Sequence, residues 1–231
     1  MSKPKKRWIL IFAILVVLQV ISMWGAPVEF STETVVGIDK ADTAWMIVAT
    51  AFVLFMTPGL SFFYGGMVSW KNVVSTMLQS FIALGVISLL WYLIGFSLAF
   101  GESFYGLIGN PFTYFCFQNV GLAPHPDFSP TIPFLIFALF QLKFAIITPA
   151  LITGSFAERV KFTSYLLFMV LFALLIYAPL AHWTWHPQGF LRQWGVLDFA
   201  GGTVVHMSAG FAALAGAFVL GKREVKMHQP A

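Results

Sequence analysis

The side chains that could do chemistry are few, and they lie within or beside long apolar segments. His206 and Lys143 are ionisable residues inside such segments, and Asp198 precedes the last of them. An ionisable side chain in the hydrocarbon region of a bilayer is costly, and it usually marks a path for ions, protons or substrates. These residues predict a transport path through a membrane and not an enzyme, so no catalytic residue is assigned.

His206 follows Asp198 by eight residues, which is roughly 12 Å along a helix and close to mid-membrane. Four small residues share its helical face: Gly202, Ala209, Gly210 and Ala213. Small residues let a second helix approach closely, so we expect His206 to point into a packed bundle and not into lipid. It would there be a functional residue or a structural hydrogen-bond partner. Asp198 is expected to cap the helix, and its charge would also favour cations near a pore mouth.

His182 and His186 stand at the helical i, i+4 spacing of a metal-ligand pair. No third ligand of a suitable type is nearby, so we expect no metal and no cofactor. Trp185 lies between them and has two open interpretations. Its indole face could hold a partly dehydrated cation, or it could be an anchor at the membrane interface.

Phe140 and Phe144 occur in the segment Phe140-Gln-Leu-Lys-Phe144, and their spacing puts them on one helical face. Lys143 lies between them and is anomalous. A bare ammonium group within a membrane must snorkel outward, be paired or lose its proton. We therefore expect Lys143 either to turn away from the path or to alter its function.

The composition of the chain requires a membrane. Of its 231 residues, 59% are hydrophobic and 10% are charged, whereas soluble proteins carry about 25% charged residues. Five segments are uncharged or carry one ionisable residue: 44–68, 73–100, 131–157, 162–181 and 199–221. Each is long enough to cross a bilayer as a helix. The sequence therefore predicts an all-α polytopic membrane protein with five transmembrane helices.

The N-terminal residues 1–26 combine four basic residues before Trp8 with an apolar stretch, a pattern typical of a signal peptide. Cleavage after Ala26 is favoured over retention as a membrane anchor. The predicted order is then a signal peptide (1–26), an extracytoplasmic segment (27–43), the five-helix domain (44–221) and a cytoplasmic tail (222–231).

The basic residues predict the orientation. Six follow the first, third and fifth apolar segments: Lys71, Arg159, Lys161, Lys222, Arg223 and Lys226. The opposite side carries Lys40 and Arg192. The positive-inside rule places the mature N-terminus outside a cell membrane and the C-terminus in the cytoplasm, which explains the basic excess without nucleic acid. Five tryptophans near external span ends are expected to be interfacial anchors: Trp45, Trp91, Trp183, Trp185 and Trp194.

Four motifs together resemble the ammonium transporter (Amt/Mep/Rh) family. They are Met56-Thr-Pro-Gly-Leu-Ser-Phe-Phe-Tyr-Gly-Gly-Met67, the segment from Phe140 to Gly154, Ala157-Glu-Arg-Val-Lys-Phe162, and Asp198-Phe-Ala-Gly-Gly-Thr-Val-Val-His206. The resemblance implies an inverted-repeat fold of about ten or eleven spans. This chain would supply the first half, and the partner histidine of the pore would lie beyond Ala231.

The resemblance also implies a role for each matching residue. Trp185 and Phe144 would recruit ammonium, and Asp198 would order that site. Phe140 and Phe144 would gate the pore below it. His206 would be the first of two pore histidines.

Ammonium or ammonia is the implied substrate, with a homotrimer for the complete protein and a cytosolic regulatory protein acting on parts outside this chain. Lys143 departs from the neutral residue that is usual in the family. One alternative is an ammonium-sensing membrane domain of a signalling protein. Another is a membrane enzyme that uses His182 and His186 as metal ligands.

Overall fold

The computed structural model describes residues 13–14, 16–17, 20 and 37–222. Within these residues, five helical segments are long and apolar enough to cross a membrane: Lys40–Gly65, Trp70–Phe100, Phe134–Phe156, Phe162–Gln193 and Gly202–Leu220. The predicted fold class is therefore confirmed, although the fourth segment continues well beyond its predicted end at residue 181. Most of the predicted signal peptide and of the predicted tail lies outside the described residues.

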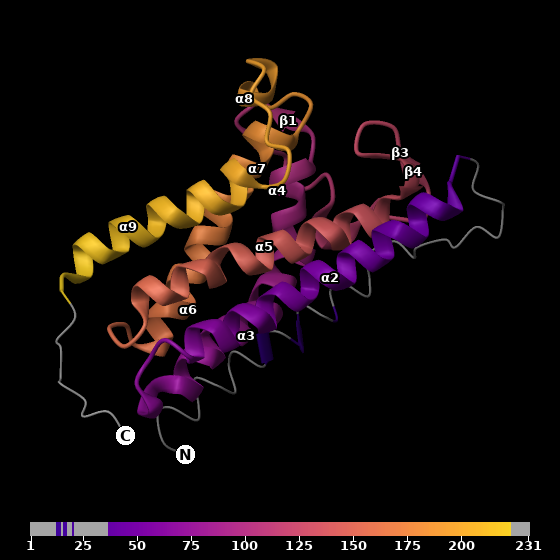
Figure 1. Ribbon diagram of the computed structural model, residues 1–231. Coiled ribbons are helices and arrows are strands. Elements are labelled where there is room, and N and C mark those ends of the chain that lie inside the picture. Colours follow the sequence, from indigo (N-terminus) through magenta and orange to yellow (C-terminus); the bar gives the residue numbers. More distant parts are fainter. Residues whose placement is uncertain (1–12, 15, 18–19, 21–36, 223–231) are drawn as a thin grey trace.

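The first and third spans are single helices, and the other three contain π-helical turns (Figure 1). The first span is α2 (Lys40–Gly65) and the third is α5 (Phe134–Phe156). The second comprises η1 (Trp70–Asn72), α3 (Val73–Leu90), η2 (Trp91–Gly95) and α4 (Phe96–Phe100). The fourth comprises α6 (Phe162–Phe172), η4 (Ala173–Tyr177), α7 (Ala178–Trp185) and α8 (Phe190–Gln193). The fifth comprises η5 (Gly202–Met207) and α9 (Ser208–Leu220).

Local chemistry explains where the helices start and how they accommodate proline. The carboxylate of Asp39 accepts a hydrogen bond from the N–H of Asp42 at 2.8 Å and caps α2. Pro58 and Pro149 lie inside α2 and α5, which is tolerated in a bundle because neighbouring groups satisfy the carbonyls that proline frees. Pro179 follows the π-helical turn η4. Such a widened turn gives room to a proline ring that would otherwise clash with the preceding turn.

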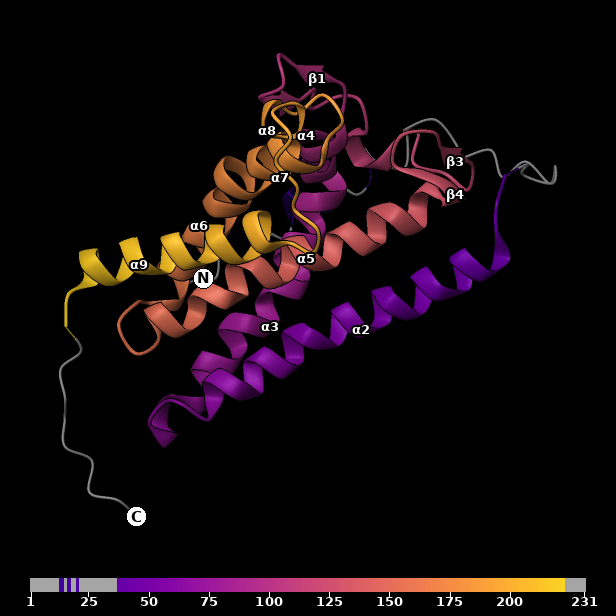
Figure 2. The same ribbon diagram turned by 45° about the horizontal axis from the view of Figure 1, so that its top comes forward.

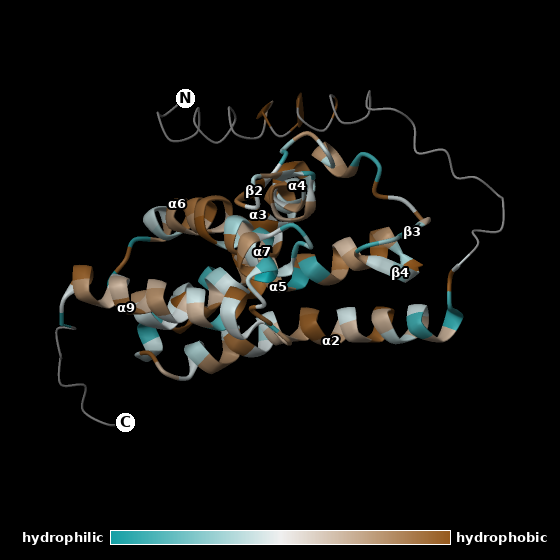
Figure 3. Ribbon diagram, turned by 90° about the horizontal axis from the view of Figure 1, so that it is seen from above, coloured by the Kyte–Doolittle hydropathy of each residue, from teal (hydrophilic) through white to brown (hydrophobic). Residues whose placement is uncertain are grey.

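Helix α5 is the centre of the bundle. It packs against α2, α3 and α9, and Figures 1 and 2 show it running between α2 and α9. Ala138, Ala145 and Ala150 on this helix are fully buried or nearly so. Small side chains of this kind allow helices to approach closely in a membrane. The hydropathy colouring in Figure 3 shows hydrophobic residues along most of the spans.

Trp91 corrects one prediction, because it is not an interfacial anchor. It lies inside the second span with only 2% of its surface exposed. Its indole N–H donates to the carbonyl oxygen of Ala138 at 3.2 Å, and its ring meets that of Tyr177 edge-on. Trp91 therefore joins the second, third and fourth spans. Trp45 and Trp194 are 70% and 76% exposed, as interfacial anchors require.

The long connection between the second and third spans forms two short hairpins. Strand β1 (Ser103–Phe104) pairs antiparallel with β2 (Ile108–Gly109), and β3 (Pro124–His125) pairs with β4 (Ser129–Pro133), with the 3-10 turn η3 (Phe115–Phe117) between the two hairpins. His182 of α7 fastens this connection to the bundle. Its Nδ1 lies 2.9 Å from the carbonyl oxygen of Ala99, and its Nε2 lies 2.8 Å from the hydroxyl of Ser103.

Glu158 and Arg159 connect the ends of the spans that lie opposite the two hairpins. Oε1 of Glu158 accepts hydrogen bonds from the backbone N–H of Ser69 at 2.9 Å, from its hydroxyl at 2.8 Å and from the side-chain amide of Asn72 at 3.0 Å. The guanidinium of Arg159 donates to the carbonyl oxygen of Gly221 at 2.5 Å. The links after the first and third spans therefore meet the end of the fifth span.

Candidate functional site

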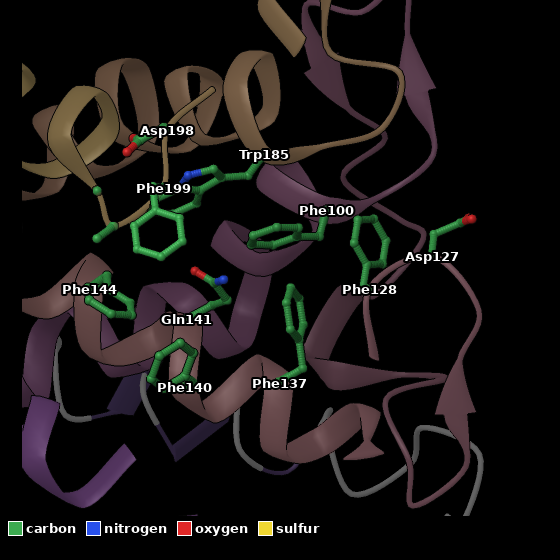
Figure 4. Close-up of a pocket in the computed structure, with 12 residues that line it drawn as sticks. Phe100, Asp127, Phe128, Phe137, Phe140, Gln141, Phe144, Trp185, Asp198 and Phe199 are labelled. Atoms are coloured by element: carbon green, nitrogen blue, oxygen red, sulfur yellow. The ribbon is translucent and has the colours of Figure 1, made fainter. Parts of the chain in front are cut away.

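A cavity of about 430 Å³ lies at the end of the bundle that carries the two hairpins (Figure 4). It is formed by α4, α5, α7, the turn between β3 and β4, and the loop before η5. Its lining residues are Phe100, Asp127, Phe128, Phe137, Phe140, Gln141, Phe144, Trp185, Asp198, Phe199, Ala200 and Gly201. Four of the predicted site residues therefore meet at one cavity: Phe140, Phe144, Trp185 and Asp198. His206 and Lys143 are not among its lining residues.

The aromatic wall of the cavity is built from edge-to-face contacts. Phe140 and Phe144 share one face of α5, as their spacing predicts, and their ring centroids lie 4.9 Å apart at an interplanar angle of 85°. The ring of Trp185, the last residue of α7, lies 6.4 Å from that of Phe144. Edge-to-face pairs are a favoured arrangement of aromatic rings. The pair leaves ring faces that could attract a cation.

Asp198 is held in place by the first turn of the fifth span. Its Oδ2 accepts hydrogen bonds from the backbone N–H groups of Thr203 at 3.1 Å and Val204 at 2.9 Å. The predicted capping role is therefore present in the structure. Gly201 makes the turn possible, since its backbone has a φ of +82° that side chains rarely tolerate. The helix N-terminus and the carboxylate stabilise each other, so the charge of Asp198 has a fixed position beside the cavity.

His206 lies in η5, beyond Asp198, and its environment differs from the expectation. The prediction that it points into a packed bundle is wrong for the described part of the chain, where His206 is exposed. Gly202 and Gly210 on the same face are exposed as well. No described residue forms a hydrogen bond with the imidazole ring. The part of the small-residue face around His206 is therefore open, although Ala209 on the same face is buried, and the imidazole nitrogens are available to a ligand or to another protein surface.

Lys143 is half-buried in α5. No described side chain forms an ion pair or a hydrogen bond with its amine. Phe137, Phe140, Gln141 and Phe144 lie on the cavity side of the helix. The helical repeat puts Lys143 about 110° away from the middle of that side. This arrangement agrees with the first of the two expectations for Lys143, in which it turns away from the path.

His182 and His186 have structural surroundings. Their rings stack with centroids 4.3 Å apart. Both nitrogens of His182 are engaged in the fold, and Nδ1 of His186 accepts a hydrogen bond from the backbone N–H of Gln188 at 3.0 Å. A metal ion could bind His182 only if one of its hydrogen bonds broke. In the part of the chain that the structure describes, no cluster of three metal-ligating side chains is present.

Several lining residues, above all Gln141 and Phe137, are not among the site residues predicted from the sequence. Both follow from helical geometry, because positions three and four residues from Phe140 and Phe144 share the same face of α5. No spacing pattern in the sequence predicts that Phe128 and Phe199 line the cavity. They lie in irregular loops, and their place at the cavity depends on the path of those loops.

Comparisons with known proteins agree with the geometry. Residues 44–231 match the Ammonium Transporter Family. An ammonium transporter of Aquifex aeolicus is 47% identical over 189 residues, which cover 81% of this chain and 44% of that protein. The crystal structure of Mep2 from Saccharomyces cerevisiae matches with a TM-score of 0.74 at 36% identity and covers 81% of this chain and 42% of that chain.

A solved sensor Amt protein matches with a TM-score of 0.70 at 32% identity, covering 78% of this chain and 44% of that chain. The chain therefore spans less than half the length of these relatives. The match nevertheless covers most of the chain, and two of the four motifs, Phe140 to Gly154 and Asp198 to His206, meet at the cavity. The chain belongs to the ammonium transporter family, as its motifs predict.

Proposed function

We propose that this chain forms the entrance and one wall of a path for ammonium or ammonia across a cell membrane. One observation carries the proposal. The cavity brings Trp185, Phe144 and Asp198 together from three different elements, which combines ring faces with a fixed negative charge. Aromatic faces attract a cation that is losing its water. A nearby carboxylate adds to that attraction without having to bind the ion directly.

The proposed path continues from the cavity toward His206. A hydrated ammonium ion enters on the side of the hairpins, sheds water against Trp185 and Phe144, and passes the rings of Phe140 and Phe144, which act as the gate. Because a bare charge is costly in the membrane, ammonia can cross more easily as a neutral molecule, with the released proton passed between hydrogen-bonded groups such as the imidazole of His206. The imidazole of His206 supplies hydrogen-bonding nitrogens along this route.

A closed pore requires that a further protein segment cover the exposed side of the fifth span around His206. We assign this role to segments corresponding to the parts of the relatives outside the matched region, since the match covers 44% of the Aquifex aeolicus protein. In the complete protein we also propose a homotrimer and a cytosolic regulatory partner. The six basic residues that follow the first, third and fifth spans support a topology with those links in the cytoplasm. A signal peptide over residues 1–26 fits that topology.

Uptake by whole cells tests the transport proposal. The protein as encoded is produced in cells that lack their own ammonium transporters, and growth on low ammonium and uptake of labelled methylammonium are measured. The proposal predicts growth and uptake that both fall when Asp198 is changed to Asn. Growth and uptake no better than in cells without the protein would contradict it.

An ammonium sensor is the second candidate function. Its support is the match to the solved sensor Amt protein, together with Lys143, which departs from the neutral residue expected there. A sensor would bind ammonium in the same cavity without conducting it. Ammonium binding by the purified protein, combined with absence of uptake, would favour this candidate over transport.

A further inference from the structure

Gln141 belongs to the cavity wall, but none of the roles assigned so far uses it. It lies on α5 between Phe140 and Phe144 in the sequence, and it points into the cavity in Figure 4. Among the residues that line the described cavity, Gln141 has the only uncharged side chain that can accept a hydrogen bond. Its neighbours there are mostly phenylalanine rings, which offer no lone pair.

The carboxamide oxygen of Gln141 lacks a partner. Oε1 is buried, and no described residue donates a hydrogen bond to it. A buried polar atom without a partner is unfavourable, and such atoms are uncommon in folded proteins. The last torsion of glutamine has a broad, two-fold energy profile. The amide can therefore turn its oxygen toward the cavity when a hydrogen-bond donor arrives there.

The carboxylates at the cavity are less suited to direct contact with a substrate. Oδ2 of Asp198 already accepts hydrogen bonds from Thr203 and Val204. Asp127 is exposed at the edge of the cavity and belongs to the turn of the β3–β4 hairpin. Among the uncharged side chains that line the described cavity, the acceptor without a partner is the amide oxygen of Gln141.

We propose that Gln141 is a specificity-determining residue, whose amide oxygen accepts an N–H hydrogen bond from ammonium beside the rings of Phe144 and Trp185. The inference rests on the proposed function and adds a direct acceptor to the cation–π contact. Ammonium carries four N–H donors, and each water molecule that it loses leaves one of them unsatisfied. A neutral oxygen replaces one such water molecule without trapping the ion by a full charge.

The amide also distinguishes between small amines. Methylammonium presents a methyl group in place of one N–H, so it satisfies a directional acceptor in fewer orientations and needs room for the methyl group beside it. Removal of the acceptor should therefore weaken the binding of ammonium more than the binding of methylammonium. If Gln141 only supported the fold, its replacement would weaken the binding of both substrates equally.

Two variants and one matched control test the proposal. Gln141→Met keeps a side chain of similar length and removes the acceptor, whereas Gln141→Glu keeps an oxygen acceptor. Gln79→Met is the control, because Gln79 is also buried in a span, at 4% exposure, and its Oε1 also lacks a partner among the described residues. Gln79 does not line the cavity. The complete protein is reconstituted in liposomes, and the currents evoked by ammonium and by methylammonium are recorded over a range of concentrations.

The proposal predicts that Gln141→Met raises the half-saturating ammonium concentration about tenfold, as expected when a charge-assisted hydrogen bond is lost. The preference for ammonium over methylammonium should fall in Gln141→Met. Gln141→Glu keeps an acceptor and adds a negative charge, so it should bind ammonium at least as tightly as the wild type, and Gln79→Met should behave as the wild type. Two results would overturn this inference alone. One is an equal loss of affinity for both substrates in Gln141→Met, and the other is an ammonium affinity of Gln141→Glu that is as weak as that of Gln141→Met. Absence of both an ammonium-evoked current and ammonium uptake in the wild type would overturn the proposed function itself.

Discussion

The ring centroids of Trp185 and Phe144 lie 6.4 Å apart at an interplanar angle of 66°. The two residues come from α7 and α5, so this contact couples the third and fourth spans at the cavity. Both rings also pack against the buried core. Their position is therefore fixed by the fold before any ligand arrives, which reduces the entropy lost when a cation binds.

Lys143→Met tests whether the charge in α5 reaches the path. Lys143 lies on a different side of α5 from the cavity residues. We therefore expect the half-saturating ammonium concentration to change by less than about twofold, since a lysine amine that extends toward the membrane interface keeps its charge away from the cavity. Concentration series of ammonium-evoked current measure this value. A much tighter affinity in the variant would show that Lys143 repels the arriving ion.

His206→Ala tests the role of the exposed imidazole. The variant should fold normally, because no described residue hydrogen-bonds the ring of His206. Ammonium transport should fall by more than about tenfold, because the polar lining of the apolar route is lost. Met207→Ala is the matched control, since Met207 is the neighbouring residue and is 52% exposed. Wild-type uptake by His206→Ala would remove His206 from the path.

Glu158→Ala tests the link between the span ends. The change removes an acceptor of three hydrogen bonds from Ser69 and Asn72. Because Glu158 is exposed, we expect a modest loss of stability, about 1 kcal/mol. Hydrogen exchange should rise in residues 66–72 and stay unchanged in the β1–β2 hairpin. Glu102→Ala, in the loop on the opposite side, is the control, and equal exchange in both variants would argue against a specific link.

His125 is expected to make the β3–β4 hairpin sensitive to acid. Burial lowers the pKa of His125 from its ordinary value of 6.5, and the charge of Asp127 opposes part of that shift. The unfolded chain therefore takes up the proton first as the pH falls. The contribution to stability is complete above the ordinary pKa and is lost as the pH falls through it toward the folded value.

His125→Phe preserves a ring beside Phe128 and Phe134, whose centroids lie 4.8 and 4.7 Å from that of His125. The melting temperature of this variant should depend less on pH than that of the wild type between about pH 5 and pH 8. Thermal unfolding followed at several pH values in that range provides the measurement. An identical pH dependence in the two proteins would assign the acid sensitivity to other groups.

Most of the fold could be predicted from the sequence because each span is apolar over its whole length. The length of a span and the charges at its ends are local properties, so they can be read without a structure. The position of Trp91 could not be predicted in this way. Tryptophan favours the interface, but this one hydrogen-bonds a carbonyl in α5, and that partner is set by how the helices pack.

The site was predicted in part for the same reason. Phe140 and Phe144 follow from helical spacing, and the capping of the fifth span by Asp198 follows from its place before a helix. The packing around His206 was not predicted correctly. Small residues show that a helix face can be closely approached, but they do not show which segment covers it, and Gly202, His206 and Gly210 remain exposed in the described part of the chain.

The most direct test of the account is the affinity of the cavity for ammonium when Trp185 is replaced. Trp185→Leu removes a cation–π contact worth about 1–2 kcal/mol, so the half-saturating concentration for ammonium-evoked current should rise roughly five- to thirtyfold. Trp194→Leu is the control, because Trp194 is 76% exposed and does not line the cavity. An unchanged half-saturating concentration in Trp185→Leu, with intact protein in the membrane, would contradict the claim that this cavity recruits ammonium.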